Sequence, residues 1–120
     1  MKTILIVEDD QNLAKGLAIR LESSGYEVKI AQDAVLGVST ALSTAPDLAL
    51  LDIMLPAGNG FTVADRIQDL LPKETPFIFL TASKQPDLRK KAWLAGAVGF
   101  FEKPYDTDEL LSSIKNTLGE

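Results

Sequence analysis

The chain has 120 residues, of which 46% are apolar and 24% are charged, and it contains neither cysteine nor histidine. This length suffices for one packed domain but not for two, so we expect residues 1–120 to form a single domain. The missing residue types exclude a disulfide framework, a thiolate metal site, an imidazole base and a phospho-histidine donor. The net charge of −5 disfavours direct binding to nucleic acid, which requires a positive surface.

A membrane location is also disfavoured. No apolar run approaches the roughly 18 residues that a membrane-spanning helix requires. The first residues enter a strand-like segment rather than the apolar stretch of a signal peptide. We therefore expect a cytoplasmic protein with no membrane partner, in which carboxylates, lysines and hydroxyls carry any chemistry.

Five short apolar runs follow one another along the chain. They are residues 4–7, 28–30, 48–51, 77–80 and 99–101. Because these runs are almost continuous, with Lys29 as the one charged residue within them, they predict strands that are buried on both faces, as in a parallel sheet. The segments between them have helical periodicity, for example in Leu13, Leu17 and Leu21.

Capping residues mark the ends of the predicted helices. Asp10, Asp33 and Asp106 stand where N-caps are expected, and Gly25 and Gly96 where helices are expected to end. Five strands alternating with five helices predict an α/β fold, a doubly wound five-stranded parallel sheet in a three-layer sandwich. The glycine-rich residues 56–60 are interpreted as a turn into the third helix.

Polar side chains follow four of the five runs, at the sheet edge where ligands of such folds bind. Glu8 and Asp9 follow the first run, and Asp52, Thr81 and Lys103 follow the third, fourth and fifth. Taken singly, each has an ordinary role in a cap, a turn or a solvated loop. Together they bring three carboxylates, a hydroxyl and an ammonium group to one edge, which predicts a shared site.

The three carboxylates predict a site for a hard divalent cation. Like charges a few ångströms apart repel by roughly 1 to 4 kcal/mol per pair at the dielectrics of water and of a protein surface. Mg²⁺ relieves this repulsion with one or two carboxylates plus phosphate oxygens, whereas Ca²⁺ requires more protein ligands. With Asp52 as nucleophile, Lys103 as a positive charge and Thr81 as a hydroxyl donor, the set resembles the parts of a phosphoryl-transfer site.

The same residues resemble the receiver domain of two-component response regulators, and the resemblance covers nearly the whole chain. The motifs that carry it are ILIVEDD at 4–10, LDIMLP at 51–56 with Gly60, LTA at 80–82, AGA at 95–97 and KP at 103–104. The resemblance implies a flavodoxin-like (βα)5 fold with strand order 2-1-3-4-5, and a receiver is itself a known example of that order. It also implies a cis peptide between Lys103 and Pro104.

Site roles follow from the resemblance as expectations. Asp52 is expected to be phosphorylated, Asp9 to bind Mg²⁺ directly and Glu8 to act on the metal through water. Met54 is expected to offer its backbone carbonyl to the metal. No other cofactor is expected.

Two further residues are implied to form a switch. Lys103 and Thr81 are expected to contact the phosphoryl group. Phosphorylation is then expected to draw the Thr81 hydroxyl inward and to let Phe100 turn toward the core, which changes the surface around the fourth and fifth helices.

The implied function is that of a signalling phospho-acceptor. The phosphoryl group is expected to come from a sensor histidine kinase or a histidine phosphotransfer protein, and the switched surface to control an output partner or effector domain. Such a domain assists its own phosphorylation and dephosphorylation and is not expected to be an enzyme.

Two features of the sequence concern the output partner or effector domain. In the DNA-binding subfamily of receivers an acidic pair follows the Gly-Ala motif and an arginine lies in the last helix, whereas here Val98, Gly99 and Ser113 occupy those places. The dimer of that subfamily, and hence its DNA-binding output, is therefore less supported. Leu88 and Trp93, in the fourth predicted helix, are candidates for a docking patch, although an amphipathic helix would bury at least one of them.

Three rival functions are weaker. A degenerate receiver that acts as a phosphorylation-independent binding module is disfavoured because every catalytic position is filled. An aspartate-nucleophile phosphatase carries Asp-x-Asp on its first strand, whereas this strand ends in Glu8, Asp9 and Asp10. A flavin carrier of the flavodoxin type requires a hydroxyl- and glycine-rich loop there, and the three acids would repel its phosphate.

Overall fold

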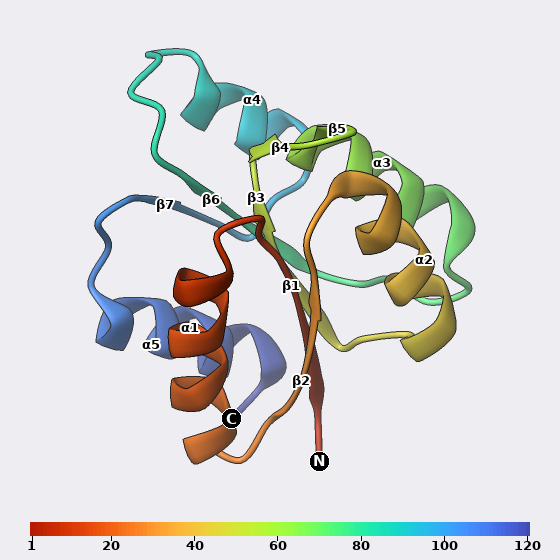
Figure 1. Ribbon diagram of the computed structural model, residues 1–120, viewed down its shortest axis with the longest axis vertical. Helices are drawn as coiled ribbons and strands as arrows, with labels where there is room; N and C mark the ends of the chain where they lie inside the picture. The colour runs from red at the N-terminus through yellow and green to blue at the C-terminus, as the bar shows by residue number, and fades with distance from the viewer.

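A five-stranded parallel sheet runs through the middle of the computed structural model, which describes residues 1–120 (Figure 1). Its strands are β1 (Thr3–Val7), β2 (Glu27–Ala31), β3 (Leu48–Asp52), β6 (Phe77–Thr81) and β7 (Gly99–Glu102). They lie in the order β2-β1-β3-β6-β7, and all four pairings are parallel. This is the predicted order 2-1-3-4-5 of the five sheet strands.

Helices cover both faces of the sheet. They are α1 (Gln11–Ser23), α2 (Ala34–Thr44), α3 (Gly60–Leu70), α4 (Leu88–Leu94) and α5 (Thr107–Leu118). The first and the last helix lie on one face, and α2, α3 and α4 lie on the other (Figure 1). The predicted three-layer sandwich is therefore confirmed. None of these helices combines the length and the apolar character needed to cross a membrane.

The continuous apolar runs are explained by burial on both sides of the sheet. Every residue of β3 and of β6 is buried. In β1, Leu5 and Val7 join the core beneath α2, α3 and α4, whereas Ile4 and Ile6 join the core beneath α1 and α5. The outer strand β2 differs, because as an edge strand it leaves most of its residues partly or fully exposed.

The predicted caps are present. The side chains of Asp10, Asp33 and Asp106 each accept hydrogen bonds from backbone N–H groups of the first turn of α1, α2 and α5. Gly25 and Gly96 adopt left-handed φ angles of 95° and 97° shortly after α1 and α4 end. Local sequence signals therefore mark the starts of three helices and the ends of two.

The segment after β3 is more ordered than a simple turn. Two short strands, β4 (Met54–Leu55) and β5 (Gly58–Asn59), pair as an antiparallel ribbon, and the Asn59 side chain then caps α3. At Gly60 an added Cβ would lie 2.5 Å from the backbone oxygen of Asp52. Real Cβ atoms do not approach so closely, so the glycine lets α3 start directly against the end of β3.

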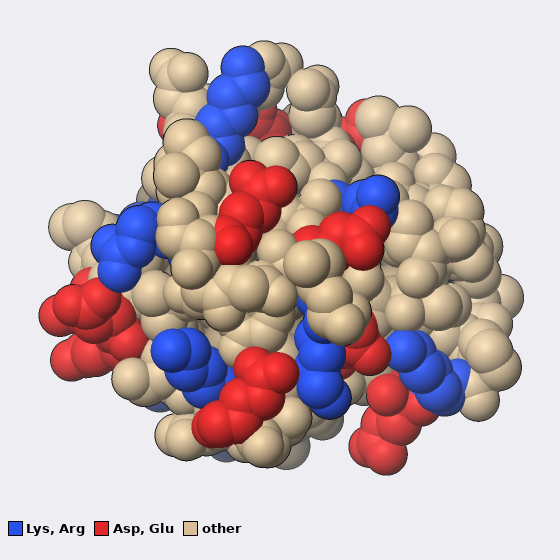
Figure 2. Space-filling model, turned by 90° about the horizontal axis from the view of Figure 1, so that it is seen from below, with Lys and Arg blue, Asp and Glu red and all other residues tan.

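The end of the sheet at which the strands begin carries charges of both signs in mixed order (Figure 2). Near that end Lys73 lies 3.4 Å from Asp47, and Lys29 lies 3.1 Å from Glu27. Such exposed pairs contribute only about 0–1 kcal/mol each. A cluster of acidic side chains, Glu8, Asp9 and Asp52, lies at the opposite end of the sheet, where the strands finish.

A pair of glycine substitutions tests the packing at Gly60. We expect Gly60→Ala to lower the free energy of unfolding by about 1–3 kcal/mol, because the new methyl group would overlap the backbone of Asp52. Gly16 is the matched control, since it lies within α1 with nothing within 4 Å of its Cβ position. Gly16→Ala should raise the free energy of unfolding by about 0.5–1 kcal/mol. Urea denaturation measures both changes, and equal stability of the two variants would contradict the packing.

Candidate functional site

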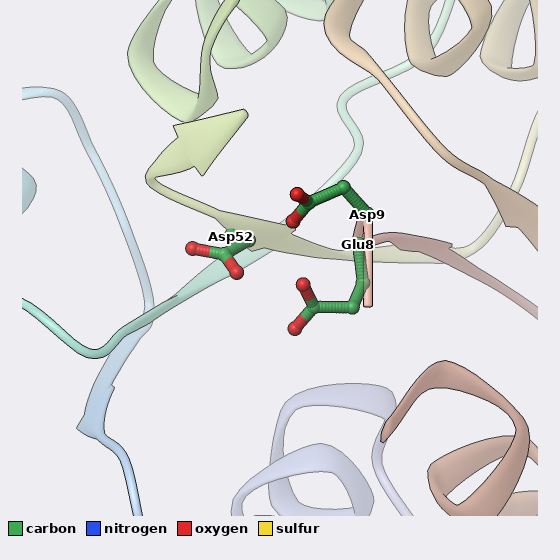
Figure 3. Close-up of side chains that lie close together, drawn as sticks. All are labelled: Glu8, Asp9 and Asp52. Atoms are coloured by element: carbon green, nitrogen blue, oxygen red, sulfur yellow. The ribbon is translucent and has the colours of Figure 1, made fainter. Parts of the chain in front are cut away.

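Three carboxylates converge where β1 and β3 finish. Glu8 and Asp9 follow β1, and Asp52 is the last residue of β3. Carboxylate oxygens of the three lie within 4.8 Å of one another, and the side chains point toward a common space (Figure 3). Glu8 and Asp52 are only 1% and 4% exposed, whereas Asp9 is exposed. The predicted convergence of these residues is therefore present.

Lys103 supplies the positive charge in this cluster. Its Nζ donates hydrogen bonds to Glu8 Oε1 and to Asp52 Oδ2, each over 2.6 Å. Its backbone N–H donates to the carbonyl oxygen of Thr81 over 2.7 Å, which fixes the end of β7 against the end of β6. The Lys103-Pro104 peptide is cis, as the resemblance implied. One ammonium group thus bridges two buried carboxylates from neighbouring strands.

Crowding of like charges changes the acidity of the pocket. Burial, the largest cause, and the neighbouring Asp52 together raise the pKa of Glu8 from an ordinary value of 4.5 to about 7, against the lowering effect of Lys103. Burial alone would lower the pKa of Lys103, but its hydrogen bonds with Asp52 and Glu8 raise it. The single ammonium group therefore does not neutralise the three acids.

The donor set suits a hard divalent cation. Carboxylate oxygens are preferred ligands of Mg²⁺, which usually takes one or two of them and keeps several waters. Asp9 is exposed at the rim, so a cation can reach the cluster from solvent. Asp52 is oriented by its neighbours, because its Oδ1 accepts the Met54 N–H over 3.0 Å and its Oδ2 accepts from Lys103. The cluster therefore has the charge and the oxygen ligands for a metal.

The other predicted site residues lie around this cluster. Met54 lies in β4 and is 63% exposed. Thr81 ends β6 and is fully buried, and its Oγ1 accepts the Ser83 N–H over 3.0 Å. Since Asp52 is in register with Leu80, Thr81 lies one residue beyond the partner of Asp52 on the adjacent strand. Phe100, in β7, is buried in the core beneath α4.

Two contacts at this edge were not predicted. The guanidinium carbon of Arg89 lies 4.8 Å from the centre of the Phe100 ring, and Lys84 pairs with Glu102 over 3.1 Å. Both contacts join α4 or the loop before it to β7. The spacing of residues in the sequence does not predict these two contacts, because it does not specify how a helix is rotated against a strand.

Comparison with known protein families identifies the family to which this site belongs. The family model of the response regulator receiver domain matches residues 4–115. The chain belongs to the response regulator receiver domain family. The predicted family and fold are therefore confirmed.

Relatives of this receiver domain are response regulators. It is 43% identical over 119 residues to the response regulator ArlR of Staphylococcus saprophyticus, covering 98% of the chain and 53% of ArlR. It is 36% identical over 119 residues to the DNA-binding dual master transcriptional regulator RpaA of Synechocystis sp., covering 98% of the chain and 49% of RpaA. The chain thus spans about half the length of these curated relatives.

A solved structure shows the same fold. The response regulator receiver domain protein (CheY-like) from Methanospirillum hungatei JF-1 matches with a TM-score of 0.92 at 33% sequence identity. The match covers 99% of this chain and 94% of that one. The strand order and the helical layers of this receiver domain are therefore those of its family.

The raised pKa of Glu8 predicts how the stability of the receiver domain depends on pH. Folded Glu8 keeps its proton up to about pH 7, whereas unfolded Glu8 releases it near pH 4.5. Without divalent cations, the contribution of Glu8 to the free energy of unfolding should thus fall as pH rises between these values, by up to about 1.4 kcal/mol per pH unit. Denaturation of wild type and Glu8→Gln at pH 5 and pH 7.5 isolates this contribution. A difference between the two proteins that is the same at both pH values would contradict it.

Proposed function

We propose that this receiver domain accepts a phosphoryl group on Asp52 in a Mg²⁺-dependent reaction. The observation that carries the proposal is the double hydrogen bond of Lys103 Nζ to Glu8 and Asp52, each 2.6 Å long, beside the exposed carboxylate of Asp9. An oriented carboxylate, a fixed positive charge and a cation-binding cluster are what phosphoryl transfer requires, since its catalysis consists of positioning and charge stabilisation.

The phosphoryl donor is proposed to be a phospho-histidine of a sensor histidine kinase or a histidine phosphotransfer protein. An oxygen of Asp52 attacks the phosphorus, the phosphorus–nitrogen bond breaks, and its electron pair returns to the imidazole of the donor. The product is an acyl phosphate on Asp52. Because residues 1–120 contain no histidine, the donor histidine cannot belong to this domain. Water attack at the same phosphorus later restores the carboxylate.

Lys103 and Thr81 are proposed to contact the transferred group. The Lys103 ammonium already donates to Asp52 Oδ2, so it is placed to donate to an oxygen of a phosphoryl group attached there. The Thr81 hydroxyl lies at the end of the next strand, and its oxygen is held by the Ser83 N–H. Both groups stabilise negative charge that arrives with the phosphoryl group.

Mg²⁺ is the proposed cofactor. Asp9 and Asp52 would hold it directly, Glu8 through water, and Met54 through its backbone carbonyl. When bound, Mg²⁺ supplies the positive charge that lets a phosphoryl group enter a pocket containing three carboxylates. The support is the donor set itself, with carboxylate oxygens within 4.8 Å of one another and only one ammonium group among them.

The output is proposed to run through the surface formed by α4, β7 and α5. Thr81 and Phe100 would transmit the presence of the phosphoryl group to that surface, which then controls a partner or an effector domain. In this view residues 1–120 act as one cytoplasmic signalling domain, and not as an enzyme that turns over a substrate. RpaA is a DNA-binding regulator, which supports a transcriptional output for a longer protein with this receiver domain, even though Val98, Gly99 and Ser113 replace the dimer residues of the DNA-binding subfamily.

Intact mass after incubation with acetyl phosphate tests the proposed acceptor. With Mg²⁺ the wild type should gain one phosphoryl group, and without Mg²⁺ it should gain none, because the carboxylate cluster then repels the donor. Asp52→Asn should gain none in either condition. Asp65→Asn is the matched control, because it removes an exposed carboxylate from α3, and it should behave as the wild type.

Two results would contradict this assignment. A phosphoryl gain that persists in Asp52→Asn would place the acceptor elsewhere. A wild type that binds Mg²⁺ but gains no mass would show a binding module that works without phosphorylation.

A further inference from the structure

Arg89 of α4 lies against the aromatic residue of the proposed switch. Its guanidinium carbon is 4.8 Å from the centroid of the Phe100 ring, within the range of a cation–π interaction. The ring is only 8% exposed and shares its core with Leu88 and Ala92, which lie one residue before and three residues after Arg89 in the same helix. One turn of α4 therefore provides both apolar contacts to the core that contains the ring and a cation over the ring.

An ionic network anchors the guanidinium group in this position. Arg89 Nη2 lies 3.8 Å from Glu102 Oε1, and Lys84 Nζ lies 3.1 Å from Glu102 Oε2. Lys84 Nζ also donates to the carbonyl oxygen of Lys103 over 3.5 Å. Glu102 is two residues after Phe100 in the same strand and directly precedes Lys103. The network thus ties α4 and the loop before it to the end of β7, beside the acceptor pocket.

We propose that Arg89 is a positioning residue that holds Phe100 in its buried position and thereby favours the conformation that accepts the phosphoryl group. The inference rests on the proposed function, in which the phosphoryl group on Asp52 and the buried position of Phe100 occur together. The ring lies in the core, and the cation over it is Arg89. This contact does not involve Asp52, so the stabilisation that it supplies does not depend on phosphorylation.

The expected effect follows from the strength of the contact. A cation–π interaction at a partly exposed site shifts an equilibrium between two ring positions by about two- to fivefold. Phosphorylation and ring burial favour each other, so a ligand that mimics the phosphoryl group should bind more tightly when the buried position is more populated. The apparent affinity changes at most by the same factor, because it follows the fraction of molecules with the ring buried.

The first experiment measures the ring directly, in metal-free protein labelled with fluorophenylalanine. The ¹⁹F resonance of Phe100 is assigned by its loss in Phe100→Leu. Arg89→Gln should move this resonance toward the position of a solvent-exposed ring. Arg89→Lys should restore most of the wild-type position, because lysine keeps a cation that can lie over the ring. Lys90→Gln is the matched control, since it removes an exposed charge from the neighbouring position of α4.

The second experiment measures the affinity for Mg²⁺ with beryllofluoride, a phosphoryl analogue, in the same variants. Arg89→Gln should weaken the apparent affinity by up to about two- to fivefold, while Arg89→Lys and Lys90→Gln should stay close to the wild type. The proposal is overturned if Arg89→Gln leaves the Phe100 resonance and the affinity unchanged. It is also overturned if Lys90→Gln has the same effect as Arg89→Gln, which would indicate a general effect of charge.

The two proposals fail in different ways. If the wild type binds no beryllofluoride and gains no phosphoryl group, the proposed function is wrong. A selective shift of the Phe100 resonance in Arg89→Gln would then still support the positioning role of Arg89. If the wild type is phosphorylated on Asp52 but Arg89→Gln changes neither measurement, the proposed function stands and the role of Arg89 is wrong.

Discussion

Two buried carboxylates on neighbouring strands would repel each other, and the Lys103 ammonium group holds both of them with hydrogen bonds of 2.6 Å. The rest of the site depends on this bridge. Removing either partner of a buried pair leaves an uncompensated charge and is strongly destabilising. The bridge nevertheless does not neutralise the site, because Asp9 adds a third carboxylate. The pKa of Glu8 is also raised, to about 7. The pocket therefore favours additional positive charge, which is why the proposed sites for a divalent cation and for phosphoryl transfer coincide here.

The order and register of the strands determine which of these side chains meet at the site. In a parallel sheet all strands finish at one edge, so side chains far apart in the sequence meet there. The register of β1 with β3 places Glu8 beside Asp52, and the backbone bond from Lys103 to Thr81 joins the last two strands. Gly60 then allows α3 to begin against the backbone of Asp52. Asp52, the proposed acceptor, thus lies at the end of a buried strand, while Asp9 beside it is exposed.

Much of this arrangement can be predicted from the sequence, because it follows from local signals. Unbroken apolar runs predicted buried parallel strands, and Asp10, Asp33 and Asp106 predicted the starts of three helices. The carboxylate cluster followed from the rule that strand ends share one edge. The apolar run of β2 predicted burial on both faces, because such a run does not show whether its strand lies at an edge. Only the strand order implied by the resemblance places β2 there. The contact of Arg89 with Phe100 was not predicted either, since it depends on how α4 is rotated against β7. The sequence of residues 56–60 indicates only a turn, because the paired strands β4 and β5 are each two residues long.

The central claim is that Glu8, Asp9, Asp52 and Lys103 form one site for a divalent cation and a phosphoryl group. A crystal structure grown with Mg²⁺ and beryllofluoride tests it most directly. We expect the metal beside the carboxylates of Asp9 and Asp52, the beryllofluoride on Asp52, and the Lys103 ammonium group in contact with a fluorine atom. Electron density for the metal at another place, or a beryllofluoride group away from Asp52, would contradict the claim.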